Sequence, residues 1–273
     1  MQLVGYRVQE RAKEGPNPFG GPVYAVPTTG STMEDARELV LSGPVTGPDS
    51  AVASAAGAVL RCDFQTAGRG QGPNRSWTAP RGSSLMFTLC LPEPWVPAPW
   101  EALPLRMALG LARFLEERRY ADVRIKWPND LFLGGKKVAG ILCHHAASWF
   151  LVGIGLNVNQ RRFPPDLRAP ATSLALAGAA DPSEVIDPGT LLSPLLAHLR
   201  SALEAVEWRR SLEQRLAGVG SRVILKGAGL RSGAGSEAVP GVVVGIGETG
   251  ALRVRRSDTG EIEELFTRDR IDW

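Results

Sequence analysis

The sequence predicts an α+β protein in two parts, and three observations lead to that prediction. Up to about residue 217, strand-like runs are interspersed with segments of helical periodicity. After Gly218 only short apolar runs follow, separated by glycine-rich turns. The 273 residues are 44% hydrophobic and 22% charged, which is typical of a globular protein with a sizeable core. We therefore expect a larger unit over residues 1–217 and a small β unit over residues 218–273.

The elements of the larger unit follow from apolar spacing between glycine and proline breakers. Residues 1–20 are predicted to form an arm or a loop, and residues 177–190 a loop. Ser31-Thr32-Met33-Glu34 has the pattern of a capping box ahead of the first helix. The last helix is expected to be the longest, with one apolar stripe formed by Leu192, Leu195, Leu199, Leu203 and Val206. Strands are expected at 23–27, 58–64, 84–91, 123–127, 138–143 and 150–158, and helices at 33–41, 103–119 and 191–216.

The small unit is predicted to contain four strands and a flexible hairpin loop. The strands are expected at 223–225, 241–246, 251–255 and 262–267. The loop is expected at 227–236, where Gly, Ala and Ser predominate. About 55 residues with this pattern are typical of a small barrel or sandwich.

Charge and cysteine usage narrow the class of protein. The net charge is +3, from 31 basic and 28 acidic residues dispersed along the chain, which does not favour a nucleic-acid scaffold. Residues 1–17 lack the apolar segment of a signal peptide, and no apolar run is long enough to span a bilayer. Cys62, Cys90 and Cys143 each lie in an apolar strand-like run, as buried reduced thiols do. These observations predict a cytoplasmic protein without a catalytic cysteine.

The first candidate site segment runs from Gly68 to Trp77 and reads GRGQGPNRSW. Its three glycines allow backbone N–H groups to approach a ligand, and consecutive N–H groups can form an anion-binding nest. Arg69 and Arg75 carry guanidinium groups suited to phosphate or carboxylate. The glycine spacing is neither that of a Walker A loop nor that of a dinucleotide fingerprint. On the residues alone, an anion-binding loop and an ordinary surface loop remain equally open.

The second segment, Lys126-Trp127-Pro128-Asn129-Asp130, places a cation, an aromatic ring, an amide and a carboxylate at the end of a predicted strand. Asp130 could hold Mg²⁺ or orient an incoming amine. Residues 133–137 are predicted to form a hairpin turn that returns Lys137 to the side of the 123–127 strand. A surface Lys–Asp pair and a core tryptophan remain the alternative interpretation.

Two further segments carry polar groups that a ligand could use. The run from Gly153 to Asn159, GIGLNVN, is a strand whose glycines admit a ligand against the backbone and whose asparagines can read an adenine or amide edge. Ser31 and Thr32 begin a helix, where free N–H groups can meet an anion, although plain N-capping is the simpler explanation. The histidines lack metal-ligand spacing and are expected to be structural; they are His144, His145 and His198.

In this order, the segments resemble the biotin–protein ligases over roughly residues 24–160. The resemblance rests on Ser31-Thr32, Gln65, Gly68-Arg69-Gly70, Trp77, Pro80-x-Gly82, Lys126 to Asp130, Lys137-Val138-Ala139-Gly140-Ile141-Leu142 and Gly153 to Asn159. It implies a mixed β-sheet catalytic domain flanked by helices, similar to class II aminoacyl-tRNA synthetases, and a C-terminal SH3-like β-barrel. It also implies an enzyme that uses ATP and Mg²⁺ to form biotinyl-5′-AMP and then biotinylates a lysine of a biotin carboxyl carrier domain.

The resemblance also implies roles for individual residues. The implied catalytic residues are Lys137, Arg69, Asp130 and Lys126, and Asp130 is also the implied metal ligand. The implied biotin-binding residues are Ser31, Thr32, Gln65, Gly68, Arg69, Gly70, Lys137, Gly140 and Gly153. The implied nucleotide-binding residues are Arg75, Trp77, Asn129 and Asn157.

The chain departs from the family pattern at Gln71, where the family often has a basic residue, and the loop before Trp77 is one residue longer. Only about twenty residues precede the first strand, too few for the helix-turn-helix of regulatory members, so no DNA partner is expected. The competing functions are a lipoate or octanoate ligase of the same superfamily and a non-catalytic biotin-binding module. The oligomeric state stays open, a homodimer included.

Overall fold

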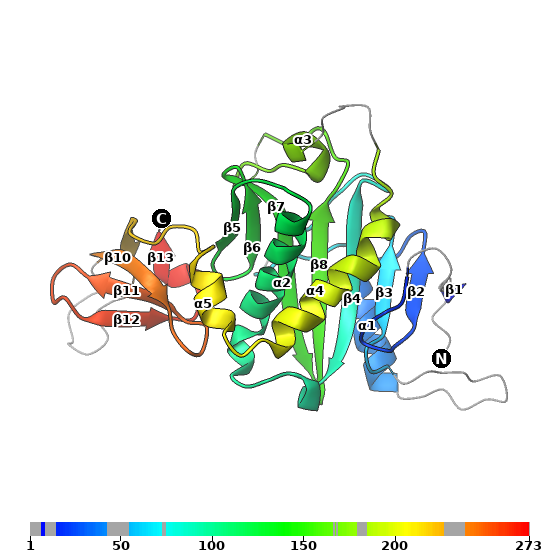
Figure 1. Ribbon diagram of the computed structural model, residues 1–273, viewed down its shortest axis with the longest axis horizontal. Helices are drawn as coiled ribbons and strands as arrows, with labels where there is room; N and C mark the ends of the chain where they lie inside the picture. The colour runs from blue at the N-terminus through cyan, green and yellow to red at the C-terminus, as the bar shows by residue number, and fades with distance from the viewer. Residues whose placement is uncertain are drawn as a thin grey trace.

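The computed structural model describes residues 7–8, 15–42, 55–72, 75–165, 167, 169–178, 185–226 and 238–272. An eight-stranded mixed sheet forms the larger unit, and a five-stranded antiparallel sheet lies beside it near the C-terminus (Figure 1). The predicted α+β class is therefore confirmed. The arm predicted over residues 1–20 falls largely outside the described residues, and the loop predicted over 227–236 falls entirely outside them.

The large sheet has the strand order β1-β2-β3-β4-β8-β7-β6-β5. Strands β2 and β3 are parallel and the other neighbours are antiparallel, so the sheet is mixed. The strands are β1 (Arg7–Val8), β2 (Val23–Val26), β3 (Val59–Cys62), β4 (Ser84–Pro92), β5 (Val123–Lys126), β6 (Asp130–Leu133), β7 (Lys136–Ala146) and β8 (Trp149–Asn157).

Helices cover both faces of this sheet because its central strands are apolar on both sides. Leu85, Phe87 and Leu89 of β4 pack with α2 (Leu103–Glu117) and α4 (Leu192–Glu204), which cross one face together (Figure 1). Side chains alternate between the two faces along β4, so Cys90 points to the opposite face and packs with α1 (Thr32–Ser42). The remaining α-helices are short: α3 (Leu174–Gly178) and α5 (Trp208–Glu213).

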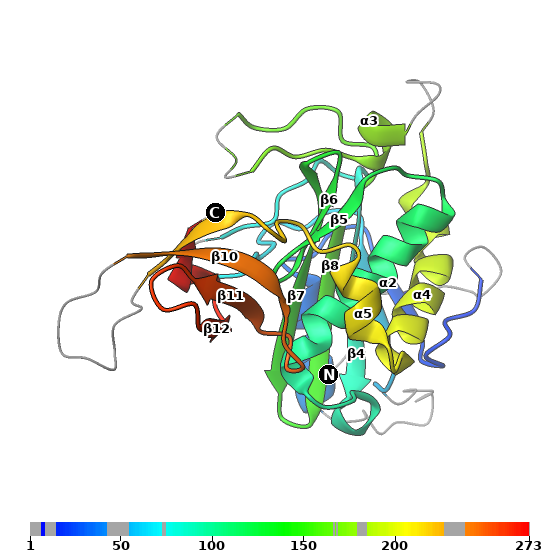
Figure 2. The same ribbon diagram turned by 60° about the vertical axis from the view of Figure 1, so that its left-hand side comes forward.

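The single long helix predicted over residues 191–216 is wrong. The chain leaves the helical conformation at Ala205 and re-enters it at Trp208, so that α5 turns toward the C-terminal sheet (Figure 2). The buried Arg106 of α2 explains the break, because its guanidinium donates to the carbonyls of Leu203 and Ala205 at 2.9 and 3.0 Å and satisfies the end of α4. Val206, predicted on the buried stripe, is consequently 90% exposed.

Strand β6 was not predicted from the sequence, and its presence changes where Lys137 lies. The turn after β5 is formed by residues 127–129, and Asp130 pairs with Lys126 at once. Strand β7 then pairs with β6, so Lys137 lies opposite Phe132. The expectation that a hairpin returns Lys137 to the side of the 123–127 strand is therefore wrong, because β6 lies between that strand and β7.

The C-terminal sheet has the order β12-β11-β10-β9-β13 and is antiparallel throughout. The strands are β9 (Arg222–Leu225), β10 (Val239–Ile246), β11 (Leu252–Arg256), β12 (Ile262–Leu265) and β13 (Ile271–Asp272), of which β13 was not predicted. A 3-10 turn, η4 (Arg268–Arg270), precedes β13. Apolar residues of this sheet belong to the same buried cluster as α2 and α4, so the two sheets share one core. The boundary at residues 217 and 218 stays a prediction.

The three cysteines are free thiols. Cys62 and Cys90 are buried and Cys143 is half-buried. Burial raises the pKa of each thiol to about 12. Such thiols are poor nucleophiles near neutral pH, as expected of structural cysteines. Within the described residues, no helix combines the length and apolarity needed to cross a bilayer.

Candidate active site

A pocket lies on the face of the large sheet that α1 covers, whereas α2 and α4 cover the other face. Met86, Gly155, Gly140 and Asp130 are paired in turn across β4, β8, β7 and β6 and therefore share this face. Gly153 is paired with Thr88 on one side and with Leu142 on the other in the next row. The three glycines allow other side chains to approach the backbone closely: a Cβ on Gly155 or Gly140 would meet the Trp77 ring, and one on Gly153 would meet the end of Met33. All seven of the paired residues line the pocket.

A β-bulge turns Lys137 into this pocket. The pairing steps from Leu131 opposite Ala139 to Phe132 opposite Lys137, so that Val138 is an extra residue in β7. In a regular strand, Lys137 and Gly140 would face opposite sides of the sheet because their positions differ by three. With the bulge, both line the pocket, and a Cβ built on Gly140 would lie 3.4 Å from the Lys137 Nζ.

Asp130 joins two cations at the floor of the pocket. Its Oδ1 lies 2.6 Å from the Nζ of Lys137, and its Oδ2 lies 3.4 Å from the Nη1 of Arg268. The Asp130 side chain is only 7% exposed, so both pairs act in a partly desolvated place. The Lys–Asp pair that was considered as a surface feature is thus part of the pocket.

Lys126 lies outside the pocket lining and next to this cluster. Its Nζ is 5.5 Å from the centre of the Phe132 ring. Burial lowers the pKa of Lys126, and the charge of Arg268 lowers it further, whereas Asp130 acts in the opposite direction. A catalytic contact by Lys126 itself therefore stays a prediction.

In the segment from Gly68 to Trp77, the described residues 68–72 and 75–77 pair with each other as the two arms of a hairpin and form one wall. Arg69 is bridged to Ser76, and the Trp77 N–H donates to the Gly68 carbonyl at 2.9 Å. The indole of Trp77 consequently lies flat over the sheet: a Cβ on Gly155 would come within 2.4 Å of its Cε2. The Lys137 Nζ is 5.9 Å from the same ring. Gly155 therefore admits the tryptophan to the floor of the pocket.

The start of α1 forms the opposite wall. Gln65 accepts hydrogen bonds at its Oε1 from the Thr32 backbone N–H at 2.9 Å and from the Thr32 hydroxyl at 3.3 Å. The Thr32 and Thr88 hydroxyls lie 2.9 Å apart. Glu34, predicted to close a capping box, pairs with the exposed Arg69 at 3.1 Å and ties this wall to the hairpin. The buried polar groups at this end are thus fixed in place by each other.

The four predicted nucleotide residues separate into two pairs. Trp77 and Asn129 line the pocket, whereas Arg75 and Asn157 do not. Arg75 folds back against the hairpin glycines, and Asn157 donates to the Thr172 carbonyl at 3.0 Å. Asn129 donates to the Ile141 carbonyl at 2.5 Å, while its buried Oδ1 has no hydrogen-bond partner within the described residues.

The structure brings most of the predicted site residues together. Those that line the pocket are Ser31, Thr32, Gln65, Arg69, Gly70, Trp77, Asn129, Asp130, Lys137, Gly140 and Gly153, whereas Gly68 is buried beneath the Trp77 carbonyl. Sequence analysis missed Thr88 and Arg268. A signal existed for Thr88, since it is a hydroxyl in the middle of the apolar run 84–91. For Arg268 there was none, because 138 positions separate it from Asp130.

The described residues do not form a metal site of their own. Among them, no three His, Cys, Asp or Glu side chains gather to hold a cation. Asp130 is the acidic residue at the floor, and each of its oxygens already faces a cationic side chain. Mg²⁺ is usually bound through one or two carboxylates together with substrate phosphates, so it does not need such a cluster. The implied role of Asp130 as a metal ligand stays a prediction.

Comparison with solved structures places this fold among known proteins. The chain superposes on the biotin protein ligase of Aquifex aeolicus, solved in complex with biotin and ATP, with a TM-score of 0.70 and 26% identity. The match covers 92% of this chain and 98% of the Aquifex chain. A biotin protein ligase of Leishmania major matches with a TM-score of 0.58 at 24% identity, which supports the fold alone.

Comparison of sequences extends the likeness to function. Residues 56–160 match the model of the Biotin/lipoate A/B protein ligase family. The biotin–[acetyl-CoA-carboxylase] ligase of Mycobacterium tuberculosis is 32% identical over 234 residues, which cover 83% of this chain and 80% of the relative. The ligase of the same name from Paracoccus denitrificans is also 32% identical and matches over 81% of its length. A chain with this site, this fold and these relatives belongs to the biotin–protein ligase family of enzymes.

Proposed function

We propose that this enzyme activates biotin with ATP and attaches it to a lysine of a biotin carboxyl carrier domain. In the first step, a biotin carboxylate oxygen bonds to the α-phosphorus of ATP, and the bond to pyrophosphate breaks. In the second step, the lysine amine attacks the carbonyl carbon of biotinyl-5′-AMP, an amide forms, and AMP leaves. Neither step needs a protein nucleophile, which agrees with the raised pKa values of the thiols.

The observation that carries the proposal is the placement of Lys137 above a glycine floor. The first step brings a carboxylate and a phosphate together, and these anions repel unless a cation lies between them. Lys137 reaches the pocket through the bulge and lies beside Gly140, close enough that a Cβ on this glycine would contact its Nζ at 3.4 Å. Arg69, also in the lining, supplies a second cation at the mouth.

Polar groups at the two ends of the pocket suit the two substrates. The Ser31, Thr32 and Gln65 end offers fixed donors and acceptors of the kind that match the ureido group of biotin. At the other end, the Asn129 Oδ1 is a buried acceptor without a partner in the described part of the chain, which an amino group of the adenine can satisfy. Asn157 and Arg75 do not line the pocket in this structure, and their contacts with the nucleotide stay a prediction.

For the second step, we propose that Asp130 orients the acceptor amine. When Lys137 turns to the substrate anions, the Asp130 Oδ1 that it now occupies can accept a hydrogen bond from the neutral amine of a substrate lysine. The C-terminal sheet stands beside this part of the site through Arg268, which suits a role in docking the acceptor domain. In this proposal, residues 1–217 form the catalytic unit and residues 218–273 form the small unit that helps to dock the acceptor.

The proposed function is tested by biotin-dependent exchange between labelled pyrophosphate and ATP, followed by transfer of biotin to an isolated carrier domain. Lipoate serves as the competing substrate, because a lipoate ligase would show the same exchange with lipoate. Exchange and transfer with biotin alone are the expected results. Exchange with lipoate alone would establish the alternative ligase, and biotin binding without exchange would establish a binding module.

Gln71 is expected to make the enzyme release biotinyl-AMP faster than a basic residue would. It lines the pocket and offers a hydrogen bond without a charge. A charged hydrogen bond contributes about 1 kcal/mol more than a neutral one, so Gln71→Arg is expected to slow release about fivefold. The measurement is the dissociation rate of preformed biotinyl-AMP, with Gln71→Met as the uncharged control. An unchanged or faster rate in Gln71→Arg would show that other groups already hold the intermediate.

A further inference from the structure

Two contacts from the C-terminal sheet reach the segment Lys126 to Asp130. Trp127 is buried and donates from its Nε1 to the Gly250 carbonyl at 3.0 Å. Arg268, on η4, points its Nη1 to the Asp130 Oδ2 at 3.4 Å. The first contact joins the turn after β5 to the turn between β10 and β11, and the second brings a positive charge from η4 to the floor of the pocket.

The pairing of Asp130 creates a difficulty for catalysis. Lys137 must direct its ammonium to the substrate anions, yet in the structure it lies 2.6 Å from a carboxylate that is 7% exposed. A buried carboxylate that loses its partner is strongly destabilised, because water no longer solvates it. The departure of Lys137 is therefore costly unless another cation remains on Asp130.

Arg268 is placed to be that second cation. It approaches the other oxygen of the carboxylate, so it does not compete with Lys137 for the same position. A guanidinium keeps its charge at any physiological pH and has five donors, so it can move closer when Lys137 leaves. The neighbouring cation, Lys126, places its Nζ 5.5 Å from the centre of the Phe132 ring, whereas Arg268 has an Nη1 at 3.4 Å from the Asp130 Oδ2.

We propose that Arg268 is a positioning residue that compensates Asp130 and thereby releases Lys137 to the substrates. The inference rests on the proposed function, since it assigns how the site frees its cation for adenylation. Arg268 acts through Asp130 and needs no contact with biotin or ATP. This role couples the C-terminal sheet to the first half-reaction, in addition to any docking of the acceptor.

The test is a double-mutant cycle between Arg268→Gln and Asp130→Asn in the full-length enzyme. Arg268→Gln alone is expected to lower kcat/KM for biotin-dependent exchange about tenfold, and Arg268→Lys to retain most of the rate. In the Asp130→Asn background, the amide no longer holds Lys137 by charge, so Arg268→Gln is expected to add less than about a twofold change. Biotin affinity, measured by calorimetry, gives a second cycle that does not depend on turnover.

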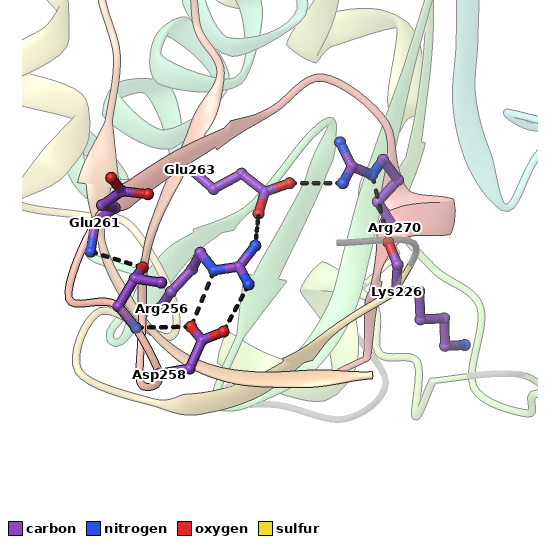
Figure 3. Close-up of polar contacts among 7 residues, drawn as sticks. Lys226, Arg256, Asp258, Glu261, Glu263 and Arg270 are labelled. Carbon is purple, nitrogen blue, oxygen red and sulfur yellow. Dashed lines mark hydrogen bonds and ion pairs between the residues drawn. The ribbon is translucent and has the colours of Figure 1, made fainter. Parts of the chain in front are cut away.

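Arg270→Gln is the matched control. Arg270 lies on the same turn, but its guanidinium pairs with Glu263 at 2.6 Å (Figure 3). Glu263 is also paired with Arg256, so the local network remains after the substitution (Figure 3). Exchange by Arg270→Gln is expected to stay within about twofold of wild type, since surface ion pairs contribute little.

Three results would overturn the inference. One is an equal loss from Arg268→Gln in both backgrounds, which would mean that Arg268 touches a substrate or acts independently of Asp130. Another is a change within twofold for Arg268→Gln alone. The third is an equal loss in Arg270→Gln, which would indicate a general effect on the C-terminal sheet. A wild-type enzyme without biotin-dependent exchange would instead reject the proposed function itself, and the inference with it.

Discussion

Lys137→Ala is expected to lower the rate of biotinyl-AMP formation on the order of a hundredfold or more. The substitution removes the cation that the β-bulge directs into the pocket, and two anions must then meet without it. The loss should not come from unfolding, because Asp130 keeps Arg268 as a partner when the lysine is gone. The measurement is single-turnover formation of biotinyl-AMP at saturating biotin and ATP.

Lys136→Ala provides the control from the adjacent position. Lys136 is exposed, begins the same strand, and is not among the residues that line the pocket. Its removal changes the net charge equally, so it should leave the rate within about twofold if the effect of Lys137 is local. Near-normal biotinyl-AMP formation by Lys137→Ala would defeat the assignment of this lysine.

Gly155→Ala is expected to reduce kcat/KM for exchange by about fivefold to 150-fold, which corresponds to an overpacking cost of about 1–3 kcal/mol. The added Cβ would lie 2.4 Å from the Cε2 of Trp77 and 2.6 Å from its Cζ2, far inside contact distance. These atoms belong to a rigid ring, so the whole indole must move away from Gly155. Because the Lys137 Nζ lies 5.9 Å from this ring, the movement displaces the wall of the pocket next to the lysine.

The cause of this loss can be separated from a general effect of alanine. Combined with Trp77→Ala, which removes the clashing ring, Gly155→Ala should cost less than about twofold. Gly30→Ala serves as the glycine control, since nothing lies within 4 Å of a Cβ at that position. If Gly155→Ala costs the same with and without the Trp77 ring, the clash is not the reason.

The sequence was informative about local structure and about the membership of the site. The strands at 84–91 and 150–158 were predicted within a residue or two, because their apolar runs are long and bounded by clear breakers. The glycines and the polar residues before α1 were assigned to one site, and most of them line one pocket. The helix at 191–216 failed because apolar spacing continues through Val206 while the tertiary contact of Arg106 ends the helix.

By itself, the sequence determined which residue types are available: a glycine-rich loop, a lysine after a glycine turn, and a carboxylate at a strand end. Periodicity and breakers are local properties, and a single chain displays them directly. Only the tertiary structure decided that β6 separates Lys137 from β5 and that one extra residue in β7 turns this lysine toward Asp130. Strand pairing, bulges and the approach of Arg268 from 138 positions away depend on how distant segments pack, and no local pattern encodes that geometry.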